Sequence, residues 1–207
     1  MLAFAAAVLA FVALPQARAA TRKPTCQARA GTTIAANGRL RVFRATKKVQ
    51  GRPRPVSVCA VGSRRVAKLG VWDECFDNDE IGSVTLAGRF LAYADTSCGL
   101  NSGDTSVRVF DAAAFKARFT GLAFTGPATA GSSRELAGLV ITDTGAVAWI
   151  GTLNIGNGTG PAELHVRPFG GADTVIDRAP DHTLSDLALV GKRLYWMHGD
   201  QARTQTI

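Results

Sequence analysis

The basic residues of this 207-residue chain gather in its first third. Between Ala20 and Trp72 there are thirteen Lys and Arg residues and no Asp or Glu. Guanidinium and ammonium groups at such a density bind anionic polymers by displacing the counterions of the polymer. The candidate residues for this anion-binding site are Arg39, Arg41, Arg44, Lys47 and Lys48.

A solvated basic face is the competing interpretation. Arg39 and Arg41 alternate with Leu40 and Val42, so the two arginines share the strand face opposite those apolar side chains. The acidic run 73-DECFDNDE-80 then neutralises part of the neighbouring excess, within a formal net charge of +8.

Catalytic chemistry is less well indicated. The three histidines are widely spaced, and no Gly-x-Ser-x-Gly nucleophile motif occurs. The run 77-DNDEIG-82 clusters carboxylates that could attract calcium, but it lacks the EF-hand spacing. We therefore predict no cofactor and no resident metal. A hydrolase or lyase would need side chains from separate segments to meet in one pocket, and its candidates are Asp95, Asp104, Asp143, His165, His182 and Asp200.

The four cysteines indicate an oxidising compartment. They are Cys26, Cys59, Cys75 and Cys98, and no pair has the two-residue gap of a zinc ribbon. Three connectivities exist for two disulfides. We predict Cys26–Cys59 and Cys75–Cys98, because each bond then stays local to one repeat.

The N-terminal residues 1–20 predict a signal peptide. An apolar block runs from Leu2 to Leu14, Pro15 interrupts it, and Ala17-Arg18-Ala19 offers a small-x-small cleavage pattern. A retained N-terminal anchor is the alternative. No later segment is apolar over enough length for a membrane span. The prediction is a secreted or extracytoplasmic protein with residues 21–207 as its folded domain.

These residues are positioned by a fourfold repeat of strands. The stretches 38-GRLRVFR-44, 88-GRFLAYA-94, 145-GAVAWIG-151 and 191-GKRLYWM-197 share a glycine, an apolar run and an aromatic. A strand precedes each stretch and one or two follow, separated by Gly, Asn, Asp, Pro and Ser clusters. The predicted repeats cover about residues 30–71, 80–122, 135–180 and 183–207.

Four-stranded units that recur at this period are typical of β-propeller blades, and a two-sheet sandwich is the alternative. The first two strands of each unit read as continuously apolar, so we expect both of their faces to be covered. The fourth unit stops within its third strand, and the segment 21-TRKPTCQARA-30 could supply its outer strand and close the ring. An open arc or a larger ring of two copies is the alternative.

The chain resembles the small exported bacterial propeller-repeat proteins with TolB-type and WD-type blades. The resemblance rests on the x-Ala-Tyr, x-Ala-Trp and x-Tyr-Trp patterns of the second strands, and no Trp-Asp dipeptide closes the repeats. It implies an all-β, propeller-like fold of about four blades and a binding or scaffold role. We thus expect a cell-envelope module, monomeric or homodimeric, that recognises an anionic polymer or a protein partner and no specific nucleic acid. A propeller-based hydrolase or lyase with its active site at the channel mouth is the alternative.

Overall fold

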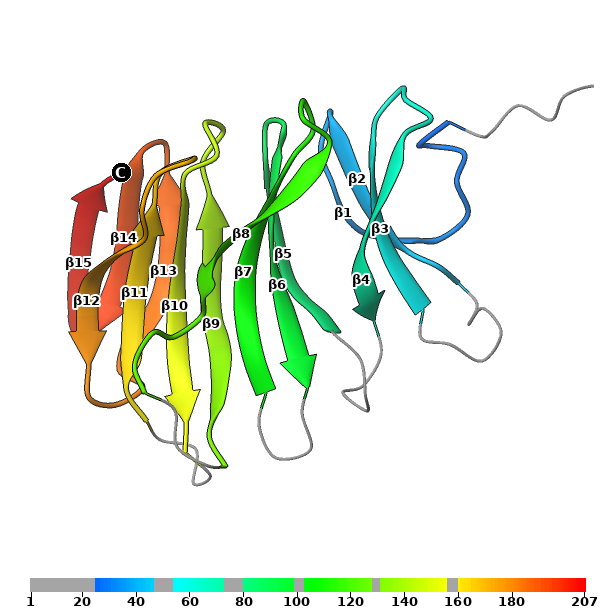
Figure 1. Cartoon of the computed structure of the whole chain (residues 1–207). Helices are drawn as coiled ribbons and strands as arrows, with labels where there is room; N and C mark the ends of the chain where they lie inside the picture. Colours follow the sequence, from blue (N-terminus) through cyan, green and yellow to red (C-terminus); the bar gives the residue numbers. More distant parts are fainter. Residues whose placement is uncertain (1–24, 47–53, 73–79, 99–102, 128–130, 156–159) are drawn as a thin grey trace, which may run out of the picture.

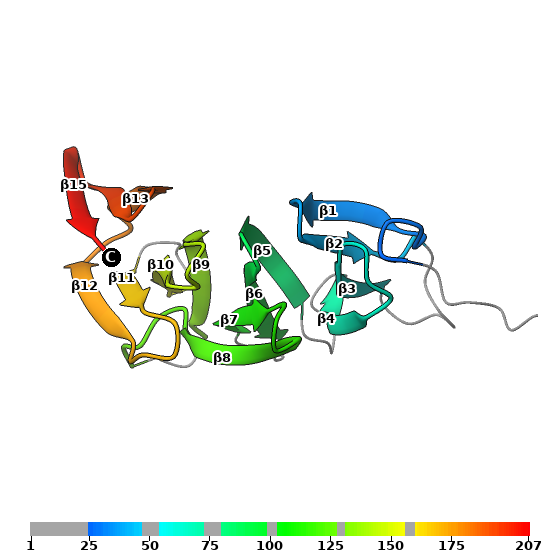
Figure 2. The same cartoon turned by 90° about the horizontal axis from the view of Figure 1, so that it is seen from above.

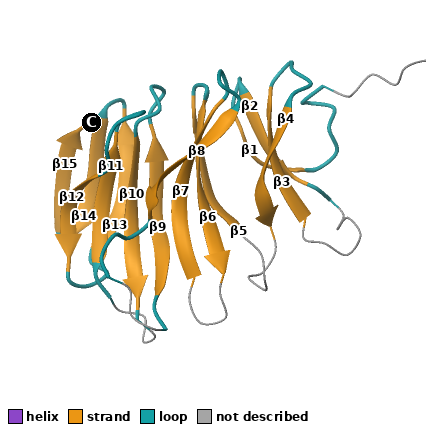
Figure 3. Cartoon of the chain, in the orientation of Figure 1, coloured by secondary structure: helices purple, strands orange, loops and turns teal. Residues whose placement is uncertain are grey.

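The protein is built from β-strands and turns. The computed structural model describes residues 25–46, 54–72, 80–98, 103–127, 131–155 and 160–207. Within these ranges there are fifteen strands, and Figure 3 shows no helix. Accordingly, the described ranges contain no helix that is long and apolar enough to cross a membrane. The all-β prediction is confirmed for this part of the chain.

The strands group into four antiparallel units that follow the order of the chain. Unit 1 contains β1 (Thr32–Ala36), β2 (Leu40–Arg44), β3 (Arg54–Ala60) and β4 (Val66–Trp72). Unit 2 contains β5 (Glu80–Ala87), β6 (Phe90–Cys98), β7 (Gly103–Asp111) and β8 (Lys116–Leu122). Unit 3 contains β9 (Ser133–Ile141), β10 (Val147–Asn154), β11 (Ala162–Arg167) and β12 (Thr174–Ala179). Unit 4 contains β13 (Leu184–Val190), β14 (Arg193–His198) and β15 (Gln201–Thr206).

The glycine of each repeated stretch lies in the turn between the first and second strands of a unit. Gly88, Gly145 and Gly191 have φ angles of 54°, 89° and 61° there. A residue with a Cβ atom is strained in this left-handed region, so glycine is the residue that such a tight hairpin favours. The repeated stretch is therefore a hairpin turn followed by the second strand of its unit.

The four units stand side by side along an open arc (Figure 2). The first strands β1, β5, β9 and β13 lie along one side of the arc, and β4, β8 and β12 lie along the other. Single parallel bridges, Val71 with Glu80 and Asp104 with Arg134, connect the first three units, whereas β13–β15 form a separate sheet. The strands do not close into a ring, so the all-β repeat is observed without the predicted closure.

Apolar side chains between neighbouring units form the core. We call the sheet face turned toward the preceding unit the leading face and the opposite one the trailing face. The repeat aromatics Tyr93, Trp149 and Trp196 lie on leading faces and are at most 6% exposed. Each packs against apolar residues on the trailing face of the preceding unit. The aromatic of the repeat thus fills the space between neighbours.

Burial within a unit departs from the prediction at the first strands. The second strand of unit 3, β10, is buried on both faces as expected, and so is most of β11. The first strands β9 and β13, however, are largely half-buried or exposed. Apolar residues of β9 pack on both faces of the sheet, Val140 toward unit 4 and Leu139 toward unit 2. The first strands are nevertheless only half-buried, because their outer edges lie along the open side of the arc (Figure 2).

The N-terminal segment caps unit 1 rather than completing unit 4. Cys26 is bonded to Cys59 of β3, and both sulfur-bearing side chains pack with Phe43, the repeat aromatic of unit 1. Residues 25–31 thereby occupy the place that a preceding unit would take. Figure 1 shows this segment and β15 at opposite ends of the arc. The predicted ring closure is wrong, because the cysteine pair holds the segment on the first unit.

The disulfide prediction is confirmed for Cys26–Cys59. Cys75, the partner that we predicted for Cys98, lies outside the described residues.

Replacing both Cys26 and Cys59 by Ser should lower the free energy of unfolding by about 3–4 kcal/mol, from the loop-closure entropy of a bond that spans 33 residues. Chemical denaturation of the two proteins under oxidising conditions measures this difference. Equal midpoints would show that the cap is held by its other interactions alone.

Candidate functional site

The short hairpin turns of all four units lie at one end of the arc, the upper end in Figure 1. We call it the hairpin end. It contains the turns between first and second strands and the turns between third and fourth strands. The opposite end, which we call the connection end, contains the loops between second and third strands and the connections between units. The antiparallel order of the strands produces this separation.

The turns between first and second strands contact one another across units. The side-chain amide of Asn37 donates to the carbonyl oxygen of Gly88 at 3.0 Å. The carbonyl oxygen of the same side chain accepts from the backbone N–H groups of Arg39 and Leu40 at 2.8 Å, which fixes its own turn. A Cβ atom at Gly88 would lie 3.4 Å from the Cβ atom of Asp143 in unit 3. These turns therefore form a connected row.

The turns between third and fourth strands are connected by arginines on aromatic rings. The Arg65 guanidinium of unit 1 lies 4.1 Å from the ring centroid of Phe115 in unit 2. Arg118 of unit 2 lies 5.7 Å from the ring centroid of Phe169 in unit 3. Such cation–π interactions contribute about 0.5–1 kcal/mol each at exposed sites. They hold the two arginines at this end while their polar edges face water.

Three hollows open at the hairpin end. One of about 170 Å³ lies between units 2 and 3 and is lined by Val109, Arg118, Val147, Arg167 and Phe169, among others. A more open one of about 500 Å³ lies beside the turn row, where Arg39, Arg89 and Asp143 line it. The third, of about 420 Å³, extends on the other side of Asp143 to Gly191 and Lys192.

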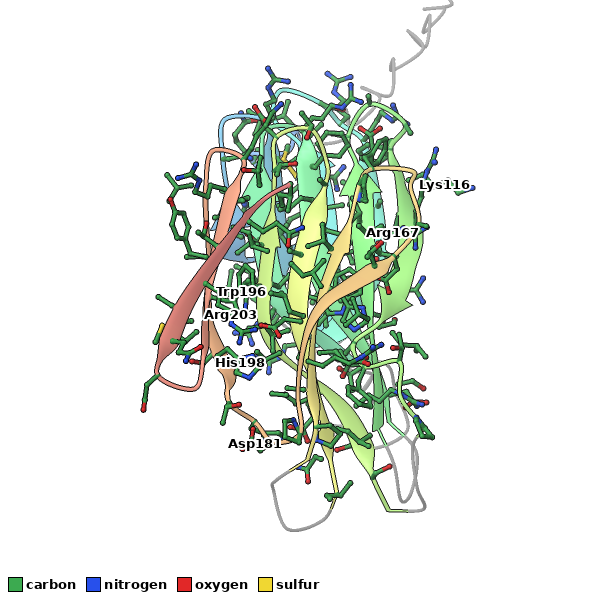
Figure 4. The ribbon with its side chains drawn as sticks, turned by 90° about the vertical axis from the view of Figure 1, so that its left-hand side faces the viewer. Lys116, Arg167, Asp181, Trp196, His198 and Arg203 are labelled. Carbon is green, nitrogen blue, oxygen red and sulfur yellow. A yellow bond between two sulfur atoms is a disulfide. The ribbon has the colours of Figure 1, made fainter. Side chains whose placement is uncertain are left out.

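The exposed charge at the hairpin end is mainly positive. Asp111 is buried and paired with Arg89 at 3.2 Å, and Asp173 accepts from His165. Among the described residues of these turns, Asp143 is the exposed acid. The exposed cations are Arg39, Arg64, Arg65, Arg89, Lys116, Arg118, Lys192 and Arg193. Figure 4 shows Lys116 and Arg167 toward this end and Asp181 at the opposite one.

The structure distributes the basic residues that the sequence predicted as one site. Arg39 lies at the hairpin end and lines the 500 Å³ hollow. Arg41 instead binds the cap, since its guanidinium donates to the carbonyl oxygens of Cys26, Arg29 and Gly31 at 3.0–3.1 Å. Arg44 ends β2 toward the connection end. Lys47 and Lys48 lie outside the described residues.

The hairpin-end cations of units 2 and 4 were missed because they are far from Arg39 in the sequence. Their signal was present in the repeat itself. Arg39, Arg89 and Lys192 each follow the glycine of a repeated stretch, so equivalent positions place them in equivalent turns.

The acids and histidines considered for catalysis lie in separate places. Asp95 pairs with Arg108, and Asp104 pairs with Arg134 at 2.6 Å. His165 is fully buried in β11. Of the six candidates, Asp143 alone lines any of the three hollows described above. The structure therefore brings no catalytic group of these residues together in a described hollow.

A buried ionic cluster surrounds His165 in unit 3. Its ring stacks on that of Trp149 with the centroids 4.7 Å apart, Nδ1 lies 3.0 Å from Asp173, and Nε2 lies 3.2 Å from Glu163. Both ring nitrogens can donate to these carboxylates only as the imidazolium. Burial alone would raise the pKa of Glu163, but hydrogen bonds from Thr125 and Arg178 and the charge of His165 hold that pKa below its usual range. The polar groups of the cluster are paired with one another, so we assign the cluster a role in the stability of the fold.

Asp177 joins units 3 and 4 in the same way. Its carboxylate on β12 accepts from Trp196 Nε1 at 2.7 Å, from His198 Nδ1 at 3.1 Å and from Arg203 at 2.9 Å. The three donors lie together on β14 and β15 in Figure 4. Burial would raise the pKa of Asp177, but these donors and the Arg178 backbone N–H keep it below its usual range.

Comparison with known proteins identifies no family. No family model matches the chain, and no curated protein matches it. Among solved structures, the AtxE2 isopeptidase in its apo form is similar over 81% of this chain, with 11% sequence identity and a TM-score of 0.25. The match spans 38% of the isopeptidase chain. A TM-score this low carries no argument, so function has to be argued from the hairpin end.

Stability should decrease as the pH falls below about 5. The pKa values of Glu163 and Asp177 are lowered in the folded protein, so the unfolded chain takes up protons first and the stabilisation is lost with decreasing pH. Asp177→Asn should cost roughly 2 kcal/mol at neutral pH and flatten this dependence between about pH 5 and 3. Denaturation midpoints across the pH range measure both effects. Asp200→Asn, in the exposed β14–β15 turn, is the control and should leave the curve unchanged.

Proposed function

We propose that the chain is an extracytoplasmic binding module that holds an anionic polymer across its hairpin end. The observation that carries the proposal is the row of turns itself. Equivalent turns of units 1, 2 and 4 each present a cation directly after a glycine, at Arg39, Arg89 and Lys192. The hollows beside these residues offer space for a ligand along the row.

An extended polymer suits this arrangement better than a single small anion. The cations come from turns of several units and are therefore spread along the arc instead of converging on one point. At physiological ionic strength the Debye length is about 8 Å, so each exposed cation acts mainly on the nearest charges of a ligand. A chain of repeated phosphates or carboxylates can satisfy all of them together and release counterions along its length.

Contacts between units also hold the turns of the hairpin end in place before a ligand arrives. Asn37 connects the turns of units 1 and 2, and arginine–aromatic interactions connect the outer turns of units 1, 2 and 3. Preorganisation of this kind reduces the entropy lost when these turns become ordered on binding.

An extracytoplasmic location is supported by the Cys26–Cys59 disulfide, which persists in oxidising compartments. The predicted signal peptide, residues 1–20, lies outside the described residues. Teichoic-type polymers and acidic glycans are anionic polymers of that environment. We also propose that the four units are propeller-type blades, which agrees with the order of their strands and the packing of first strands along one side of the arc.

The test is binding of purified mature protein to long-chain polyphosphate and to poly(glycerol phosphate) over a salt series. We expect affinity to fall steeply with salt. The triple variant Arg39→Gln, Lys192→Gln, Arg193→Gln should weaken binding at least 10-fold at low salt. It should also reduce the salt slope by about one unit for each phosphate that the variant no longer neutralises.

A matched pair of single variants separates the hairpin end from net charge. Lys192→Gln should weaken binding, and Lys68→Gln should not, because Lys68 lies on β4 and lines none of the three hollows. The variant Lys47→Gln, Lys48→Gln examines the rest of the predicted basic site. Equal losses of affinity from Lys192→Gln and Lys68→Gln would contradict a localised site, and no retention of either polymer at low salt would exclude the proposed function.

Asp143→Asn should strengthen polymer binding about 2- to 5-fold. Its exposed carboxylate lies between the two larger hollows and repels an anion there. Asp200→Asn removes the same charge at the connection end and should have no effect. Weaker binding of Asp143→Asn would place the ligand elsewhere, or would assign a cationic ligand to this row.

A further inference from the structure

We propose that the trailing face of unit 4 forms a two-fold symmetric interface with the same face of a second copy of this chain. The register of β13–β15 defines this face. Ser185 is opposite Met197, Ala188 is opposite Tyr195, and Val190 is opposite Arg193. On the other side of β14, Arg193, Tyr195 and Met197 are opposite Thr206, Thr204 and Ala202. Because side chains alternate along a strand, these nine residues share one side of the sheet.

The face is open and carries large apolar side chains. Val190 is 68% exposed and Tyr195 is 39% exposed. The other side of the same sheet is buried, since Leu184, Leu194 and Trp196 pack into the core shared with unit 3. Large apolar side chains that are exposed together on one sheet face are typical of a surface that a partner covers.

The same face is covered in every other unit. Leu40 and Val42 of unit 1 pack against unit 2, Ala92 and Val109 of unit 2 pack against unit 3, and Ala148, Ile150 and Leu164 of unit 3 pack against unit 4. The open face of unit 4 therefore continues a type of interface that the protein already uses three times.

Tyr195, however, makes this face unsuitable for another unit of the same kind. The equivalent residues, which precede the repeat aromatics, are Val42, Ala92 and Ala148. Ala92 packs in the core with Trp149, and Ala148 packs with Trp196, so a small side chain receives the aromatic of the next unit. At Tyr195 that space is occupied by a phenol ring. A different surface has to cover this face.

The leading face of unit 1 is closed to a head-to-tail partner. Residues 25–31 cover it, and the Cys26–Cys59 bond and the Arg41 hydrogen bonds hold them there. A second copy thus presents no free leading face. The unit 4 face of that copy is open, and pairing of identical faces gives a closed two-fold dimer.

The face can complement itself. Tyr195 lies in the central strand between two small residues, Ala188 and Thr204, with Ala202 beside Met197. In a two-fold pair, the Tyr195 ring of each copy fits over the small residues of the other. A buried tyrosine contributes a large apolar area, and its hydroxyl finds a partner in the threonines of the opposing face. Arg193 stays at the hairpin-end rim of the interface, in contact with water.

The experiment is sedimentation velocity of the mature protein from about 1 to 200 µM, without any anionic polymer. We expect a monomer–dimer equilibrium. Tyr195→Arg should weaken dimerisation at least 10-fold, because it would bury a charge without a partner, whereas Tyr195→Phe should retain the dimer within about threefold.

A second pair of variants identifies which face of the sheet forms the dimer interface. Thr204→Arg lies on the trailing face and should abolish the dimer, whereas Gln205→Arg, the next residue on the opposite side of β15, should leave it intact. Circular dichroism and thermal denaturation establish that all four variants are folded. A wild type that stays monomeric at 200 µM overturns the proposal, and so does a dimer that survives both Tyr195→Arg and Thr204→Arg. Neither outcome bears on polymer binding at the hairpin end.

Discussion

The structure depends on the packing of one sheet face against the next. A single unit could not bury its apolar residues alone, because both faces of an isolated antiparallel sheet are exposed to water. Trp149 enters the space above Ala92 of the preceding unit, Trp196 enters the space above Ala148, and Tyr93 packs in the same way with Val42. In the core between units 1 and 2, burial also raises the pKa of Tyr93 to about 12, so its phenol stays neutral. The alignment of the turns at the hairpin end follows from this stacking.

The strands could be predicted from the sequence because the repeat records a local requirement. A glycine in a tight turn, followed by an apolar strand with one aromatic, specifies a hairpin wherever it occurs, and all four copies do so. The predicted closure failed because it depended on where a segment without such a signal would dock. The sequence around Cys26 favours no single docking place, and it is the bond to Cys59 together with the Arg41 hydrogen bonds that holds residues 25–31 over Phe43.

The candidate site was likewise predicted only in part from the sequence. Sequence density pointed to Arg39 and Arg41 as neighbours with one role, but the structure places them differently: Arg39 ends a turn, and Arg41 donates to the carbonyls of the cap. Arg64 and Arg65 join Arg39 at the hairpin end from the same unit, and the other exposed cations of that end come from units 2 and 4, one repeat or more away along the chain. A repeat protein collects its surface from equivalent positions in successive units, so the period of the repeat locates a site better than local charge density does.

The contrast between the buried ionic clusters and the exposed cations is the reason that we propose binding at the turns. His165 and Asp177 have their hydrogen-bonding atoms occupied by partners from their own or adjacent units, and the Asp177 contacts connect unit 4 to unit 3. Changing such a group disturbs the stacking on which all turns depend. The side chains of Arg39 and Lys192 have no such role in the packing of the units. They extend into water from tight turns whose backbone conformation does not depend on them. A protein of this design can change what it binds at the hairpin end without changing how its units pack, which separates recognition from stability within one repeat.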